Sequence, residues 1–219
     1  MFKTKTTVLI LVLLATAGSA WGDGVTYQVS VDTSSISGIA GSLNFQFNSG
    51  PTMTQFATLQ ILNFATDGTL DPGGPSLFGD VSGTLPGTVS FDNAGGFDDY
   101  FTAFTFGSTL SFQVNLSGPA VTSPDGVSTS ASTFGFSMFS DPNAVTPVLT
   151  NDPNGFAFTT DINLQGSTTL TNNSAQVTAT LQGPVPTPEP SSLALMLAGI
   201  GLIMMMMRKR IPLGHQQTS

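Results

Sequence analysis

The chain has 219 residues, of which only 8% are charged, and its formal net charge is −8 at pH 7. It contains no cysteine, which excludes a disulfide framework and a thiolate metal site. No Lys, Arg or His lies between Lys5 and Arg208, so the body of the chain cannot neutralise phosphate, which argues against nucleic-acid binding.

Residues 1–20 have the three parts of a secretory signal peptide. Lys3 and Lys5 give a positive start, Val8 to Leu14 form an apolar core, and small residues lead up to Ala20. We expect an N-terminal signal helix that signal peptidase removes between Ala20 and Trp21, with a cut before Asp23 as the alternative. An uncleaved anchor helix fits less well, because the apolar core is short and ends in small residues.

Residues 23–183 are predicted to form a β-sandwich ectodomain. Apolar and polar residues alternate in short runs, the pattern of half-buried antiparallel strands. These runs are Val25–Val31, Leu43–Phe47, Leu110–Leu116, Phe134–Met138 and Phe156–Ile162. Turn-forming residues such as Asp71 to Pro75 separate them, at a spacing that predicts about ten strands. The fold class is therefore all-β, a β-sandwich, with a jelly-roll arrangement as one option.

One run, Thr54 to Phe64, is apolar on both faces and fits either a central strand or a short helix; we predict a strand. Most of the 17 phenylalanines lie in the body, where Leu and Ile are scarce. Because an aromatic side chain buries roughly 150–250 Å², we expect these rings to form the core.

The body has no His, Cys or Lys to activate a nucleophile, so we expect that the protein is not an enzyme and assign no catalytic residue. A carboxylate pair for glycoside cleavage would come from Asp92, Asp98 and Asp99. The alternative places these three residues in solvated loops around Gly95 and Gly96.

The same three residues are candidate calcium ligands, because Ca²⁺ prefers oxygen ligands from loops. With Asn93 they make one acidic cluster; Asp67 with Asp71 and Asp152 with Asn154 make two others. None has EF-hand spacing, and turn capping by Asp and Asn explains each of them. No other cofactor is expected.

An aromatic carbohydrate-binding surface is a further option. Tyr100, Phe101 and Phe104 lie close in sequence to Asp98 and Asp99. However, Tyr100, Thr102, Phe104 and Phe106 alternate with the residues between them, which favours packing in the core.

The C-terminal stretch has three parts in a fixed order. A Pro-rich linker, 184–190, ends in Pro188, Glu189 and Pro190, and prolines keep a backbone extended. Residues 191–207 are apolar and predict a transmembrane helix, short for a bilayer of roughly 30 Å. Residues 208–219 begin with Arg208, Lys209 and Arg210, which predict a cytoplasmic tail that stops translocation. A buried core helix fits less well, because the run has no polar face.

This order resembles the PEP-CTERM sorting signal of bacterial surface proteins, which exosortase enzymes process. Pro188, Glu189 and Pro190 match its Pro-Glu-Pro motif, 191–207 its hydrophobic segment and 208–210 its basic end. The chain departs from the usual pattern by continuing from Ile211 to Ser219. Stretches of the body, such as Tyr100 to Gly118, resemble a recurring type of PEP-CTERM ectodomain that has no assigned activity.

The resemblance implies a non-enzymatic exported protein of the cell surface or extracellular matrix, associated with exopolysaccharide. It implies exosortase as a partner, together with signal peptidase and the inner membrane. The C-terminal helix would anchor the chain transiently, with the ectodomain outside. The alternative is a secreted lectin-like or glycoside-hydrolysing module delivered by the same signal.

Overall fold

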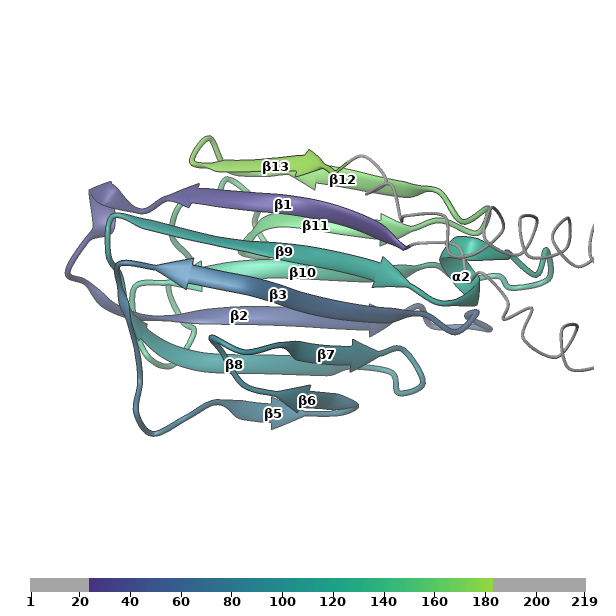
Figure 1. Ribbon diagram of the computed structural model, residues 1–219, viewed down its shortest axis with the longest axis horizontal. Coiled ribbons are helices and arrows are strands. Elements are labelled where there is room, and N and C mark those ends of the chain that lie inside the picture. The colour runs from purple at the N-terminus through teal and green to yellow at the C-terminus, as the bar shows by residue number, and fades with distance from the viewer. Residues whose placement is uncertain (1–23, 183–219) are drawn as a thin grey trace, which may run out of the picture. The chain divides into compact units, whose positions relative to one another are not determined.

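A computed structural model describes residues 24–182 of the chain (Figure 1). The predicted signal helix with its cleavage point at Ala20 and Trp21 lies outside the described residues. So do the Pro-Glu-Pro linker, the transmembrane helix and the basic tail. Within residues 24–182, no helix is long and apolar enough to cross a membrane.

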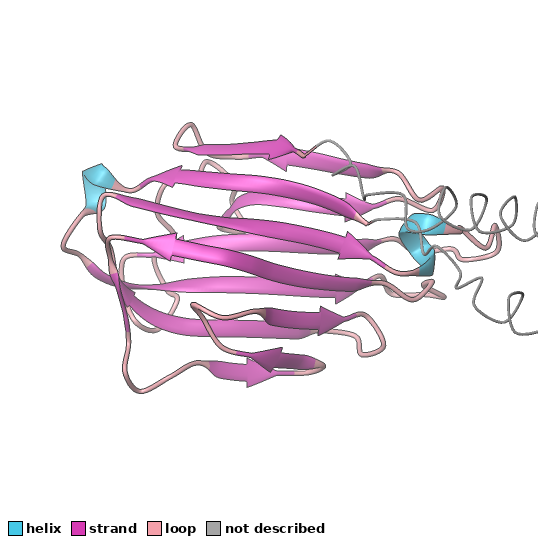
Figure 2. Ribbon diagram, in the orientation of Figure 1, coloured by secondary structure: helices cyan, strands magenta, loops and turns pink. Residues whose placement is uncertain are grey.

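The regular secondary structure of the described residues is nearly all strand, with almost no helix, as Figure 2 shows, so the all-β prediction is confirmed. The strands are β1 Val25–Asp32, β2 Ala40–Ser49, β3 Thr58–Thr66, β4 Thr69–Leu70, β5 Ser76–Phe78, β6 Val81–Gly83, β7 Val89–Asp92, β8 Asp98–Thr105, β9 Thr109–Ser117, β10 Ser132–Phe139, β11 Phe156–Ile162, β12 Thr168–Asn172 and β13 Val177–Leu181. Two short helical turns are η1, Ser34–Ile36, and α2, Pro119–Thr122.

The strands form two antiparallel sheets that lie one on the other (Figure 1). Sheet A has the order β13-β1-β9-β3-β7-β6. Sheet B has the order β12-β11-β10-β2-β8-β4, and β5 pairs with β8 beside β4. The β-sandwich is thus observed, whereas the jelly-roll arrangement stays a prediction.

The alternation of apolar and polar residues in the sequence corresponds to an alternation of buried and exposed side chains along the strands. In β9, Leu110, Phe112, Val114 and Leu116 are buried and the residues between them are partly exposed or exposed. The apolar residues therefore face the opposite sheet, and Ser, Thr, Gln and Asn face outward. The strand predicted over Thr54 to Phe64 is observed in its second part, because β3 begins at Thr58. A register shift between Leu62 and Ala65 bends its pairing with β9.

The core is built of phenylalanine, as predicted. Phe112 of sheet A lies 5.3 Å from Phe45 and 5.0 Å from Phe136 of sheet B, measured between ring centroids. Phe158 of sheet B completes the group, 5.8 Å from Phe136 and 6.3 Å from Phe112. All four rings are at most 1% exposed. Edge-to-face and tilted contacts of this kind stabilise beyond the area that they bury.

One buried polar side chain, Asn93, ties the sheets together at one end. Its Oδ1 accepts a hydrogen bond from the backbone N–H of Ala57 at 2.7 Å. Its Nδ2 donates to the carbonyl of Gln55 and to the hydroxyl of Ser132, both at 2.8 Å. Asn93 follows β7 of sheet A and Ser132 begins β10 of sheet B, so these bonds fix the spacing of the two sheets.

Candidate functional site: the carboxylates around Gly95

The structure separates two of the three aspartates that the sequence placed together. Asp98 and Asp99 are the first two residues of β8, so their side chains point to opposite faces of sheet B. Asp98 pairs directly with the buried Phe47 and points into the sandwich, where it is 0% exposed. The interpretation of a solvated loop is therefore wrong for Asp98, because strand β8 begins at this residue and takes it inside.

Asp98 is a buried carboxylate that is only half satisfied. Its Oδ1 accepts a hydrogen bond of 2.6 Å from the backbone N–H of Asp80. Its Oδ2 is buried and has no hydrogen-bond partner among the described residues. Burial raises the pKa of Asp98; the Asp80 N–H lowers it in part, and the charges of Asp80 and Asp92 raise it further.

Asp80 is the site residue that the sequence did not reveal. It lies just before β6, and its exposed carboxylate meets Asp98 across Gly95. A Cβ atom at Gly95 would lie 3.0 Å from Asp80 Oδ2 and 3.4 Å from Asp98 Oδ1. At Gly79, where φ is +78°, a Cβ atom would collide with Asp98 Oδ1. Two glycines thus allow the two carboxylates to approach, a signal visible only once the loops are folded.

Asp92 lies at the end of β7, where its Oδ1 accepts a hydrogen bond from the N–H of Ala94 at 2.9 Å. With Asp80, Ser82 and Ser90 it lines an open depression of about 290 Å³ on sheet A. Its charge reaches Asp98 only at a distance, as one contribution to the raised pKa of Asp98.

Asp99 belongs to another surface, the outer face of sheet B. The amide of Asn44 donates to Asp99 Oδ1 at 2.5 Å. Burial raises the pKa of Asp99, and hydrogen bonds from Asn44 and Gln46 oppose this rise. Of the predicted set, Asp98 and Asp92 therefore lie near Asp80, whereas Asp99 points away.

The other predicted calcium clusters cap turns. Asp67 accepts from the backbone N–H groups of Ser108 and Thr109, and Asp152 accepts from that of Phe156. Asp141, not predicted as a ligand, caps a loop through the N–H groups of Asn143, Val145 and Thr146. Among residues 24–182, no three acidic or histidine side chains are grouped as a metal site.

The aromatic residues divide as their alternation predicts. Tyr100 and Phe104 are 1% and 2% exposed and belong to the core, so they present no binding surface. The exposed pair is instead Phe78, at 63%, and Phe97, at 45%, with ring centroids 5.8 Å apart. Phe78 pairs directly with Asp99, so it shares the outer face of sheet B with that carboxylate.

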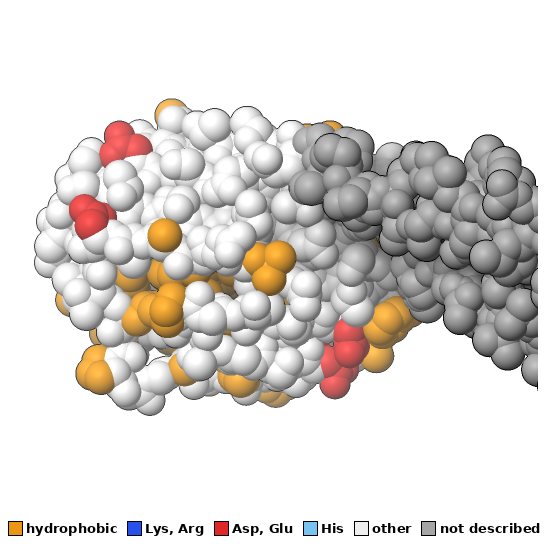
Figure 3. Space-filling view, viewed as in Figure 1, with side chains coloured by type: hydrophobic (Ala, Val, Ile, Leu, Met, Phe, Trp, Pro, Cys, Tyr) orange, Lys and Arg blue, Asp and Glu red, His pale blue; other side chains and the backbone are white. Residues whose placement is uncertain are grey.

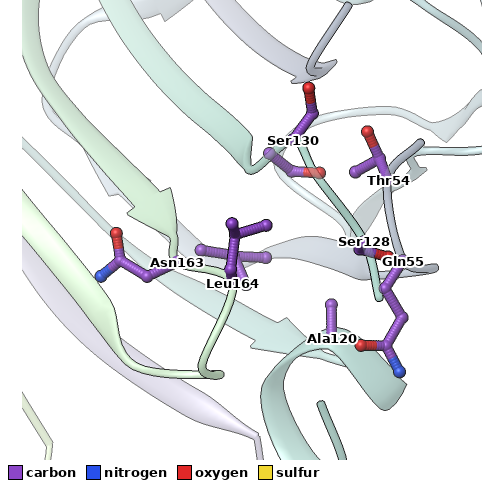
Figure 4. Close-up of a pocket in the computed structure, with 9 residues that line it drawn as sticks. Thr54, Gln55, Ala120, Ser128, Ser130, Asn163 and Leu164 are labelled. Atoms are coloured by element: carbon purple, nitrogen blue, oxygen red, sulfur yellow. The ribbon is translucent and has the colours of Figure 1, made fainter. Parts of the chain in front are cut away.

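A small pocket lies at the end of the sandwich where α2 packs (Figure 4). Thr54, Gln55 and Ala120 line one side, and Asn163 and Leu164 line the other. Its interior of about 10 Å³ holds about one water molecule and excludes a sugar ring.

No basic side chain occurs in residues 24–182, and the face in Figure 3 shows carboxylates on a mostly uncharged surface. Every carboxylate of this domain therefore lacks a Lys or Arg partner within it. An anionic ligand would find no basic side chain to pair with in this domain, whereas a cation would find carboxylates.

The family model of the PEP-CTERM protein-sorting motif matches residues 186–210 of this chain. No curated protein and no solved structure matches it.

Proposed function

Because residues 186–210 carry the PEP-CTERM protein-sorting motif, we propose that this chain is a non-enzymatic exported protein of the cell surface or extracellular matrix. The motif indicates export, membrane-linked sorting and processing by exosortase. In the proposed route, signal peptidase removes residues 1–20. The apolar stretch 191–207 then holds the chain in the inner membrane until exosortase acts.

The order of the C-terminal parts supports this route. A cation costs roughly 2.5–3.5 kcal/mol at the centre of a membrane helix, so Arg208, Lys209 and Arg210 halt translocation and stay inside. The linker before the apolar run then lies at the outer surface, extended by its prolines. An extended backbone is the form that an enzyme cleft can bind by strand-like pairing.

The chemistry of the described domain supports a non-enzymatic role. Without Lys, His or Cys, residues 24–182 have only Asp carboxylates to act as a general base on a hydroxyl nucleophile. Asp98 is fully buried and Asp99 lies on the other face of the strand, so these two cannot flank one substrate bond.

Intact-mass measurement of the protein from its own host tests the sorting route. We expect a product that lacks everything beyond the neighbourhood of Pro190, and a full C-terminus when the exosortase is deleted. Glu189→Ala should slow the truncation without altering membrane insertion, whereas Asp71→Asn, a charge removed outside the signal, should leave it unchanged. A product that retains residues 204–210 in both hosts would show a plain membrane anchor.

The exposed pair of Phe78 and Phe97 favours a second candidate, carbohydrate binding. Sugar C–H groups stack on the negative face of an aromatic ring, and polar side chains beside the rings, here Asp99, bind hydroxyls. Cosedimentation of the full chain with exopolysaccharide extracted from its host tests this candidate. Phe97→Ala should reduce binding, and Phe56→Ala, at an equally exposed ring, should not. Equal binding by both variants would refute this surface.

A further inference from the structure

Large apolar side chains are exposed at one end of the sandwich. Loops 50–57, 118–131 and 163–167 lie together at this end, because β2, β9 and β11 end there and β3, β10 and β12 begin there. Four exposed residues of these loops are called the end patch: Met53, Phe56, Val127 and Leu164.

The four residues of the end patch form one surface around the small pocket of Figure 4. The carbonyl of Met53 accepts a hydrogen bond of 2.9 Å from a backbone N–H two residues after Val127. Gln55, which lies between Met53 and Phe56, lines the pocket, and so does Leu164. Segments that are far apart in the sequence therefore present their apolar side chains side by side.

The polar groups of these loops bond to one another, which leaves the apolar side chains at the surface. The amide of Gln55 donates to the carbonyl of Ser123 and accepts from the N–H of Asp125, both at 2.9 Å. The carboxylate of Asp125 accepts from the N–H groups of Val127 and Ser128, both at 2.9 Å. Asp125 is also the only charged residue of the three loops. Contact with an apolar partner therefore leaves few polar groups without a hydrogen bond.

The described domain begins and ends at the same end of the sandwich as the end patch. The N–H of Gln182 donates to the carbonyl of Thr26 at 2.8 Å, so the start of β1 and the end of β13 lie together there. The linker of residues 183–190 separates Gln182 from the apolar stretch 191–207 and spans at most about 29 Å when extended. The argument rests on the proposed function, in which 191–207 lies in the inner membrane. The linker then keeps this end of the sandwich near the bilayer.

We propose that the end patch docks on the lipid bilayer while the chain is anchored. Apolar and aromatic side chains of membrane-bound surfaces enter the boundary between headgroups and acyl chains, to a depth of roughly 5–10 Å. The three loops contain no Lys or Arg, so they contact the apolar part of the lipid and need no anionic headgroup. Docking holds the end of the domain from which the linker leaves at the membrane surface.

The test compares a fluorescent label at two matched valines. The chain has no cysteine, so Val127→Cys and Val145→Cys each create a single site for nitrobenzoxadiazole. Val127 is 64% exposed in the end patch, and Val145 is 74% exposed at the opposite end, beyond β10. Neither substitution disturbs the core.

The labelled full chain is reconstituted into phosphatidylcholine vesicles, with and without lipid that carries a quenching doxyl group near its headgroup. The label at position 127 should be quenched at least about threefold more than the label at position 145, because only position 127 enters the bilayer boundary. Added NaCl should not change the quenching, since no ion pair with the lipid is involved.

Two charge variants, each added to Val127→Cys, test whether the end patch causes the quenching. Met53→Asp combined with Phe56→Asp puts two charges into the patch without altering the linker. It should reduce the quenching to the level of position 145. Ile39→Asp adds a charge at an exposed residue of the opposite end and should leave the quenching unchanged. The docking is overturned if the double variant is quenched as strongly as its parent.

Flotation of the vesicles after an alkaline wash separates the docking from the anchor on which it rests. A chain that does not float with the vesicles refutes the membrane anchor and the docking together. A chain that floats but is quenched equally at positions 127 and 145 overturns the docking alone. A label at position 127 that is shielded from water and not quenched by lipid also overturns it, because a second copy of the chain then covers the patch.

Discussion

Asp98→Asn should make the folded protein more stable at pH 7 when divalent cations are removed with EDTA. The substitution keeps the shape and the acceptor that binds the Asp80 N–H, and it removes a charge that is 0% exposed. Burying an ion costs several kcal/mol even after relaxation. The new amide group has no partner and costs about 1–3 kcal/mol. We expect a net gain of about 1–2 kcal/mol, or about 2–8 °C in Tm.

The pH dependence gives this prediction its sign. Burial raises the pKa of Asp98 in the folded state above the usual 3.8. At a pH between 3.8 and the folded-state pKa, the folded state therefore binds more protons than the unfolded state. The stability of wild type therefore falls as pH rises through this interval, and the full penalty remains above it. Asp98→Asn does not titrate, so its advantage should grow from nearly nothing below pH 3.8 to its maximum at neutral pH.

Thermal unfolding of both full-length proteins, followed by circular dichroism from pH 3.5 to 8 in EDTA, measures the difference. A variant less stable than wild type at pH 7, or a difference that does not change with pH, would refute the reasoning. Either result would mean that the charge of Asp98 is already compensated in the folded protein.

Three further predictions concern the fold. Phe112→Ala opens a cavity between the sheets and should cost about 3–5 kcal/mol in urea unfolding, whereas exposed Phe56→Ala should cost less than about 1 kcal/mol. Asn93→Ala removes the hydrogen-bond partner of the Ala57 N–H, the Gln55 carbonyl and the Ser132 hydroxyl. It should lower the free energy of unfolding by about 2–4 kcal/mol in the same assay, even though alanine is more apolar than asparagine. For Asp141, burial acts to raise the pKa, but the N–H groups of its loop outweigh this and lower it. Asp141→Ala should therefore destabilise the protein at neutral pH, and this loss should vanish as pH falls through the folded pKa, which lies below 3.8.

The long strands could be predicted because one periodicity decides them. In β1 and β9 every second residue is apolar, and a strand that buries one face requires this pattern. The strands β4, β5 and β6 have only two or three residues, too few to show a period. Their pairing depends on where the loops between β3 and β8 lie. Residues 24–182 therefore contain thirteen strands, where about ten were predicted.

The candidate site was predicted only in part, because its residues are brought together by the folding of loops and not by spacing in the sequence. Adjacent Asp98 and Asp99 suggested one cluster, but neighbours in a strand point apart. The alternation of Tyr100 and Phe104, extended two residues back, would have placed Asp98 on the buried face. Asp80 could not be found in this way, because it reaches Asp98 from 18 residues away through tertiary folding.

The balance of charge explains why one carboxylate stands out. Residues 24–182 contain 11 aspartates, which are the 13 acidic residues of the chain less Asp23 and Glu189, and no basic residue. Hydrogen-bond donors take the place of cations at four aspartates whose pKa values are all lowered: the hydroxyl and then the N–H of Ser34 at Asp32, and backbone N–H groups at Asp67, Asp125 and Asp141. These carboxylates also remain in contact with water. The two buried oxygens of Asp98 receive only one N–H hydrogen bond, so Asp98 is the carboxylate whose negative charge is least compensated.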